Sequence, residues 1–315
     1  MEHYIAYVAN QIQLPDGLPI QLAPSATLRR ATAEEIHQAD SRLATAAKAT
    51  SIQIGSYRHQ YECNQTGPSS HFVPTLLPQE HWRYHVLDFK GDGLGFRRLQ
   101  LTLVITEPPI YFAFTTVKSL TTPLDGVYPV QANVLERAEH LWWNDPNGQS
   151  VDPEQIRLTC QAHSELLHSR PKFMFAAEAV EKYFDLQRLP PSSDMYLLGL
   201  FSVIESLIAH KPRLTENLDS INHQLVNKLT LLDECFIDKP IQTTHFFSGI
   251  GHDKAWKKLY EFRSQLAHTS SSSLPHDLVS LQSKEVILRF INAKTKELIR
   301  FAIAQPKLLR HLREC

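Results

Sequence analysis

Hydrophobic residues in the second half of the chain recur at steps of three and four positions, which is the period of an amphipathic α-helix. The clearest example lies at 252–268, where Asp253 stands at the position of an N-cap and a run of serines follows. Its apolar stripe consists of Trp256, Leu259, Phe262 and Leu266. Helices are predicted over 153–169, 172–188, 193–210, 215–236, 252–268 and 284–304. The second half is therefore expected to be a helical bundle.

The first half contains short runs rich in Ile, Val, Tyr, Phe and Thr that are separated by Pro and Gly, which is typical of β-strands. In the predicted strand 99–106, Leu101, Leu103 and Ile105 alternate with Thr102, Val104 and Thr106. Pro108-Pro109 predicts a hairpin after that strand. The glycine-rich segment 91–95 is predicted to be a turn between strands. One helix is expected over 32–49, where Thr32 and Glu35 form a capping box. Strands are predicted over 4–13, 52–61, 82–89, 99–106, 110–117 and 127–134.

The pattern changes near residue 148. The segment 144–148 is rich in turn residues, and Asp152 followed by Pro153 is typical of a helix start. The predicted fold class is α+β, with a mixed β-rich module at 1–147 and an all-α domain at 148–315.

Composition limits the classes of function. The chain has 315 residues, 43% hydrophobic and 21% charged, and a net charge of −1, so no global positive field attracts nucleic acid or membrane. No signal peptide is recognised, and the most apolar stretch, 196–209, is too short to span a bilayer and contains Glu205. The scattered cysteines indicate a reducing compartment, so a cytoplasmic protein without membrane contact is expected. They are Cys63, Cys160, Cys235 and Cys315.

Histidines at 81 and 85 have the spacing of helical metal ligands, but they lie in a predicted strand, where positions four apart are separated by about 13 Å. His163 and His168 lack a carboxylate between them at a useful spacing. The sequence contains no H-E-x-x-H, G-x-S-x-G or phosphate-binding loop motif. Neither a metal nor a cofactor is therefore predicted.

The segment Tyr260-Glu-Phe-Arg263-Ser264-Gln-Leu-Ala-His268 resembles the signature of HEPN domains (higher eukaryotes and prokaryotes nucleotide-binding), in particular the Apea-like branch. That branch shows a Tyr-x-x-Arg-Ser-x-Leu-x-His run and an upstream helix of the form apolar-x-x-x-Glu-x-Leu, which 201–207 matches with Glu205. The resemblance covers 154–315, and the first half is similar in plan to the mixed α/β modules that precede such domains. Two other Arg–His pairs of similar spacing, Arg30/His37 and Arg157/His163, lack this context.

The resemblance implies a metal-independent endoribonuclease that acts as a toxin or antiphage defence effector. Arg263 and His268 would be its catalytic residues, in a cleft where two HEPN domains pair, and the product would be a 2′,3′-cyclic phosphate. Five residues turn a helix by a net angle of about 140°, so one unbroken helix does not place the pair on one face. A homodimer would bring two copies of each together. Expected partners are therefore RNA, a second copy, and an antitoxin or trigger molecule, with the first module as sensor or regulator.

Other residues are assigned supporting roles. Glu205 lies in an apolar stretch and needs a buried partner, for which Arg263 is the candidate. Tyr260 and Ser264 belong to the motif. A local phosphate-attracting patch is predicted at Lys254, Lys257 and Lys258.

Each assignment has an alternative. His268 could act only as a cap of the helix C-terminus. Arg263 could form a surface ion pair with Glu261 or with the next helix, and the lysines could be a solvated helix face. The alternative for the whole protein is a catalytically silent HEPN protein that binds nucleic acid or a partner.

Overall fold

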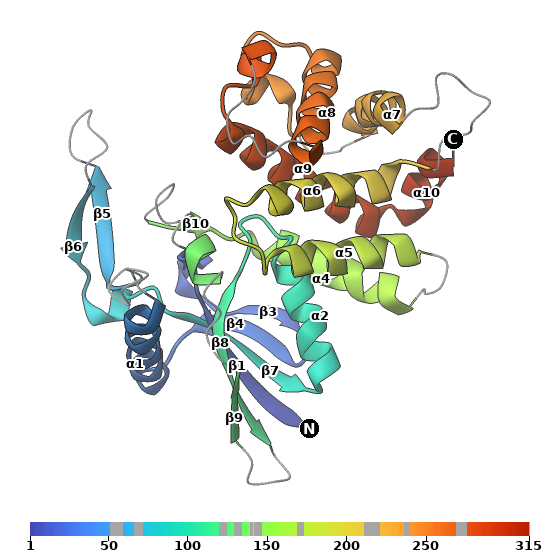
Figure 1. The fold of residues 1–315 in the computed structure, drawn as a ribbon. Helices are drawn as coiled ribbons and strands as arrows, with labels where there is room; N and C mark the ends of the chain where they lie inside the picture. Colours follow the sequence, from blue (N-terminus) through green and yellow to red (C-terminus); the bar gives the residue numbers. More distant parts are fainter. Residues whose placement is uncertain are drawn as a thin grey trace. The chain divides into compact units, whose positions relative to one another are not determined.

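The computed structural model describes residues 1–50, 59–65, 72–119, 125–128, 134–138, 141, 147–168, 173–210, 221–235, 240–268 and 276–314 (Figure 1). The fold is α+β, with an antiparallel sheet in the first part and mostly helices afterwards. Two compact units divide between Ser164 and Glu165, inside helix α4 (Pro153–His168). The predicted domain boundary at 147 precedes this division, and Ile156 and Cys160 of α4 are buried in the core of the first unit.

The first unit contains, within the described residues, a six-stranded sheet with the order β3-β4-β7-β1-β8-β9. All neighbouring pairs in this sheet are antiparallel. Its strands are β1 (Glu2–Val8), β3 (Ile20–Ala23), β4 (Ala26–Arg30), β7 (His85–Gly91), β8 (Phe112–Ser119) and β9 (Asp125–Tyr128). Two small sheets pair β2 (Ile12–Gln13) with β10 (Gln149–Ser150), and β5 (Tyr61–Gln65) with β6 (Phe72–Leu76). Single 3-10 turns occur at η1 (Pro15–Gly17) and η3 (Gln79–His81).

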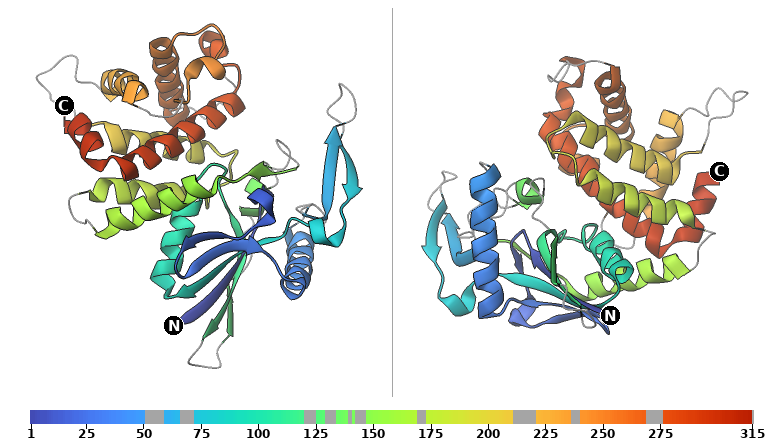
Figure 2. Two further views of the ribbon diagram at one scale, coloured as in Figure 1. Left: turned by 180° about the vertical axis from the view of Figure 1, so that it is seen from behind. Right: turned by 60° about the horizontal axis from the view of Figure 1, so that its bottom comes forward.

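The two faces of the six-stranded sheet are covered by different helices (Figure 2). Because successive side chains of a strand point to opposite faces, Tyr4 on β1 enters the hydrophobic core and Tyr7 faces the other way. Helix α2 (Gly93–Leu103) contributes Phe96 and Leu99 to the core. Helix α1 (Ala33–Thr50) lies over the Tyr7 face, where the Tyr7 hydroxyl donates a 3.1 Å hydrogen bond to Gln38.

The predicted capping box of α1 is confirmed. The Thr32 backbone N–H donates to Glu35 at 2.7 Å, and the Glu35 backbone N–H donates to the Thr32 hydroxyl at 3.3 Å. The Glu35 carboxylate also binds Arg29 of β4, which fixes the start of α1 against the sheet.

The predicted strand at 99–106 is wrong, because most of this segment belongs to helix α2. Leu99 and Leu103 also satisfy the helical period, and the Thr102 hydroxyl donates to the Arg98 carbonyl one turn earlier. The hairpin predicted at Pro108-Pro109 is also wrong, since this turn connects α2 to β8.

The glycine-rich segment 91–95 is not a turn between strands, as predicted. It joins the end of β7 to the start of α2, where the Asp92 carboxylate caps the Gly95 N–H at 2.7 Å. A Cβ on Gly91 would lie 2.4 Å from the Phe89 ring, so the glycine gives this core side chain room.

Two other predicted strands fall partly outside the described residues. The described part of 52–61 begins at residue 59, and β5 begins at Tyr61. In 127–134, strand β9 ends at Tyr128, and 134–138 is helical.

The second unit is helical, as predicted. Helix α6 packs against α5, α7, α8, α9 and α10. These helices are α5 (Met174–Leu186), α6 (Asp194–Ile208), α7 (Ile221–Cys235), α8 (His252–His268), α9 (Lys284–Ala304) and α10 (Pro306–Glu314), with 3-10 turns at η4 (Thr243–His245) and η5 (His276–Leu281). Residues 215–220 of the predicted helix 215–236 lie outside the described residues. Helix α10 was missed, because it is short and follows α9 directly. Among the described residues, every helix is too short or too polar to cross a membrane.

Replacing Gly148 with alanine is expected to destabilise the first unit strongly. Gly148 has φ +76°, and a Cβ there would lie 2.7 Å from the Gln11 backbone carbonyl. Gly17 has φ +66° with open space around it, so Gly17→Ala carries only the left-handed conformational cost of about 1–2 kcal/mol. Gly148→Ala should cost about 3 kcal/mol or more, because the backbone must also move. Urea denaturation of both variants measures the difference, and equal midpoints would contradict it.

Candidate active site on helix α8

Helix α8 carries the residues of the predicted motif along one uninterrupted element, His252–His268. The apolar stripe is confirmed, because all four of its side chains are buried. They are Trp256, Leu259, Phe262 and Leu266. This buried side fixes the rotation of the helix and therefore decides which polar residues reach solvent.

Arg263 pairs with Glu205 of α6, as the sequence predicted. The Arg263 Nε lies 3.3 Å from a Glu205 carboxylate oxygen, and the side chains are 31% and 17% exposed. The contact is an ion pair rather than an aligned hydrogen bond, because neither atom has a partner in good hydrogen-bond geometry. One edge of the guanidinium is thus held by α6, while part of the side chain remains accessible.

Tyr260 lies on the same side of α8, one turn before Arg263. The carbon of the guanidinium is 5.6 Å from the centre of the Tyr260 ring, which is the distance of a cation–π contact. Burial, and then the negative charge of Glu205, raise the pKa of Tyr260 to about 12, so the hydroxyl remains protonated at neutral pH. Glu205 and Tyr260 together restrict the orientation of Arg263.

His268 is exposed at the last residue of α8. It lies about 7.5 Å along the helix from Arg263 and about 140° around it. The structure therefore brings Arg263, Glu205 and Tyr260 together, and it leaves His268 on another face of the same helix.

His268 shares one side of α8 with polar residues that precede it at steps of three and four positions. All of them are exposed. They are Lys254, Lys257, Glu261 and Ser264. Lys258 lies beside this row and is partly buried. Two lysines and one glutamate give the row a net positive charge before His268 is counted. The roles of Ser264 and the three lysines stay predictions.

The other histidines that the sequence singles out belong to other elements. His85 is buried at the start of β7 and His81 is exposed in η3. His163 is buried, with its Nδ1 2.6 Å from the Thr102 hydroxyl, and His168 is exposed. Within the described ranges, three or more His, Cys, Asp or Glu side chains do not gather in a group that could hold a metal ion.

Burial of His85 predicts a pH-dependent stability. Burial and the nearby His59 and Arg30 lower the pKa of His85 from 6.5 to about 3. Below pH 6.5 this histidine is protonated in the unfolded chain but stays neutral in the folded chain. The free energy of unfolding therefore falls as the pH falls from 6.5 toward 3. The slope from this group is up to about 1.4 kcal/mol per pH unit. The pH dependence of the unfolding free energy should become flatter in His85→Leu and stay unchanged in His81→Leu. If the unfolding free energy depended on pH in the same way in both variants, the lowered pKa of His85 would be contradicted.

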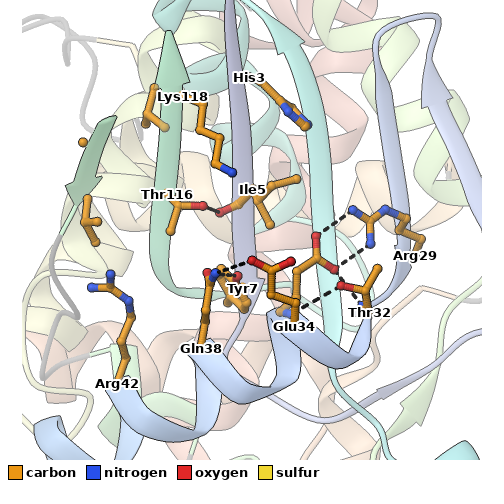
Figure 3. Close-up of a pocket in the computed structure, with 14 residues that line it drawn as sticks. His3, Ile5, Tyr7, Arg29, Thr32, Glu34, Gln38, Arg42, Thr116 and Lys118 are labelled. Carbon is orange, nitrogen blue, oxygen red and sulfur yellow. Dashed lines mark hydrogen bonds and ion pairs between the residues drawn. The ribbon is translucent and has the colours of Figure 1, made fainter. Parts of the chain in front are cut away.

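Sequence reasoning missed a pocket of about 460 Å³ in the first unit, between α1 and the side of the sheet that α1 covers (Figure 3). Its walls combine residues from β1, β4, β8, β9 and α1. Glu34, Gln38 and Arg42 recur at four-residue steps and hence share one face of α1, which is the signal that the sequence contained.

Comparison of the chain with models of protein families, with curated proteins and with solved structures gave no match.

Proposed function

We propose that the protein is a metal-independent endoribonuclease of HEPN type that acts as a toxin or antiphage defence effector. The observation that carries the proposal is the anchoring of Arg263 by Glu205 and Tyr260. A carboxylate on α6 and an aromatic ring on α8, the helix that also carries Arg263, orient a partly exposed guanidinium. The motif residues that resemble the HEPN signature thus occupy positions in which they could act on a substrate.

The reaction uses the 2′-hydroxyl that RNA carries beside each phosphodiester. His268 accepts the proton of this hydroxyl, and the 2′-oxygen forms a bond to phosphorus while the bond to the 5′-oxygen breaks. The leaving 5′-oxygen takes up a proton from a second histidine or from water. The products are a 2′,3′-cyclic phosphate and a free 5′-hydroxyl. The guanidinium of Arg263 binds the phosphate oxygens as negative charge builds on them.

The proposed active site requires two copies of the chain. Within one copy, Arg263 and His268 face directions about 140° apart, so a phosphate held by one does not reach the other. A two-fold dimer through the exposed side of α8 would place His268 of each copy near Arg263 of the other. Lys254 and Lys257 on the same side would then attract the RNA backbone.

Incubation of the purified full chain with total RNA in excess EDTA tests this function. The expected result is cleavage with cyclic phosphate ends, and an oligonucleotide with 2′-O-methyl groups at every position should stay intact. Cleavage of the methylated strand, or a requirement for added metal, would contradict the proposed chemistry.

The second candidate is a catalytically silent HEPN protein that binds nucleic acid or a partner. It is favoured by the separation of Arg263 and His268 on an unbroken helix. This candidate predicts intact RNA at high protein concentration in the same assay, and a strict monomer at micromolar concentration would contradict the composite active site. In either case, the first unit is the proposed sensor or regulator, which responds to a trigger molecule or an antitoxin.

A further inference from the structure

The pocket in the first unit has a floor of sheet residues and a wall of helix residues. Ile5 of β1 and Thr116 of β8 are cross-strand neighbours on the floor, with Val127 of β9 beside them. Gln38 and Arg42 of α1 form the wall. The floor is largely apolar, whereas the rim and wall carry charges. A pocket of about 460 Å³ has the size of a small-molecule site.

At one end of this pocket the charged groups pair with one another. Arg29 pairs with Glu35 at 2.8 Å and with Asp88 at 2.9 Å, and His3 lies 2.8 Å from the same Asp88. Burial alone would raise the pKa values of Glu35 and Asp88. Hydrogen bonds and charge from the Arg29 guanidinium outweigh burial, so both pKa values lie below their usual range. Arg29 is thus engaged by two carboxylates, so this end offers no free cation to an anionic ligand.

The other end is positive. Arg42 lies over the Phe114 ring at 5.4 Å, which holds its charge near the pocket. Lys118 of β8 points into the space between Arg42 and the Arg29 cluster (Figure 3). Among the described residues, neither Arg42 nor Lys118 forms an ion pair with a carboxylate. Two cations of the described part of the chain therefore line one cavity without an ion-pair partner.

Glu34 adds an acceptor between the two ends. Its carboxylate accepts from the Gln38 amide at 3.5 Å, a long contact that leaves its oxygens able to accept from a ligand. A carboxylate in this position suits neighbouring hydroxyl groups, as in the recognition of ribose by Asp or Glu in nucleotide sites. The pocket thus combines two cations for an anion, one carboxylate for hydroxyls, and an apolar floor.

We propose that the pocket between α1 and the sheet binds a phosphorylated ribose, with the phosphate held by Arg42 and Lys118 and the ribose hydroxyls by Glu34. A phosphate carries up to two negative charges, which matches the two cations. The ligand is either a free sugar phosphate or a nucleotide, since both present this chemistry. The proposal concerns the first unit alone and does not depend on ribonuclease activity.

Isothermal titration calorimetry of the full chain with ribose 5-phosphate and adenosine 5′-monophosphate tests the proposal. Both should bind, and ribose and adenosine should bind at least about tenfold more weakly, because they lack the charged group. A tighter complex with the nucleotide would identify the base as part of the ligand, and equal affinities would identify a sugar phosphate.

Substitutions locate the site. Arg42→Gln and Lys118→Gln should each weaken binding of ribose 5-phosphate by about tenfold. Lys48→Gln removes the same charge from another face of α1 and should change the affinity by less than about twofold. Glu34→Gln should weaken the binding of ribose 5-phosphate more than the binding of inorganic phosphate. The absence of binding by both phosphorylated probes at millimolar concentration would overturn the proposal, as would unchanged affinities in Arg42→Gln and Lys118→Gln.

Discussion

Replacement of His268 by alanine is expected to lower the rate of RNA cleavage by about 10²–10⁴-fold, which is the usual contribution of general acid–base catalysis. His268 is exposed at the end of α8, so the substitution should leave the fold and its stability unchanged. The cleavage rate of a labelled RNA in EDTA, together with the unfolding midpoint, measures both expectations. His311→Ala removes an exposed histidine from α10 and is the matched control, which should cut RNA at the wild-type rate.

Arg263 needs a more conservative substitution, because its loss also leaves Glu205 without its cation. Arg263→Lys keeps the charge and the ion pair but removes the planar fork that binds two phosphate oxygens. A strong loss of cleavage with an unchanged unfolding midpoint is therefore expected. Full activity in both His268→Ala and Arg263→Lys would place the chemistry elsewhere in the chain.

The largest expected effect on stability follows from Lys294, whose side chain is 0% exposed in the interior of the second unit. Its ammonium contacts Asp233 of α7 and lies 2.7 Å from Glu297 of α9. Glu297 also accepts from the Ile241 backbone N–H at 2.8 Å. The carboxylates are only 16% and 10% exposed. Lys294→Met leaves both without their cation in a desolvated site, and should cost about 3–5 kcal/mol.

Chemical denaturation measures this cost, and Lys284→Met is its control. Lys284 pairs with Asp194, but these side chains are 30% and 40% exposed, so the loss should stay below about 1 kcal/mol. In Lys294→Met/Asp233→Asn, part of the stability should return, because one uncompensated charge is removed. A Lys294→Met variant as stable as Lys284→Met would contradict the burial of this network.

The sequence predicted the elements whose hydrophobic period has only one interpretation. In α8 and α9, residues at three- and four-residue steps point to one buried side, and the predicted helices are confirmed. At 99–106 the pattern was ambiguous, because the spacing of Leu99 and Leu103 fits a strand and a helix equally. In the structure, residues 99–103 belong to helix α2, which packs against β7. Lys294 lies on the buried side of α9, between Ile291 and Leu298, but the sequence pattern neither singled it out nor showed its partners.

The two candidate sites, on α8 and in the pocket of the first unit, also differ in how far the sequence could predict them. The pairing of Glu205 with Arg263 could be predicted, since a carboxylate inside an apolar helix needs a cation and the motif supplied one. The pocket in the first unit could not, because Arg42 of α1 and Lys118 of β8 line one cavity only once the strands beneath α1 have paired, and these strands are distant in the sequence. Spacing along a chain shows which residues share a helix face, but not which strands become neighbours.

A mixed dimer tests the proposed composite active site most directly. One copy would carry Arg263→Lys and the other His268→Ala, with different affinity tags so that only the mixed species is purified. Each homodimer should be inactive. In the mixed dimer, one of the two sites keeps an intact arginine from one copy and an intact histidine from the other, so about half of the wild-type cleavage rate should return. A mixed dimer as inactive as the two homodimers, beside an active wild type, would contradict the shared site.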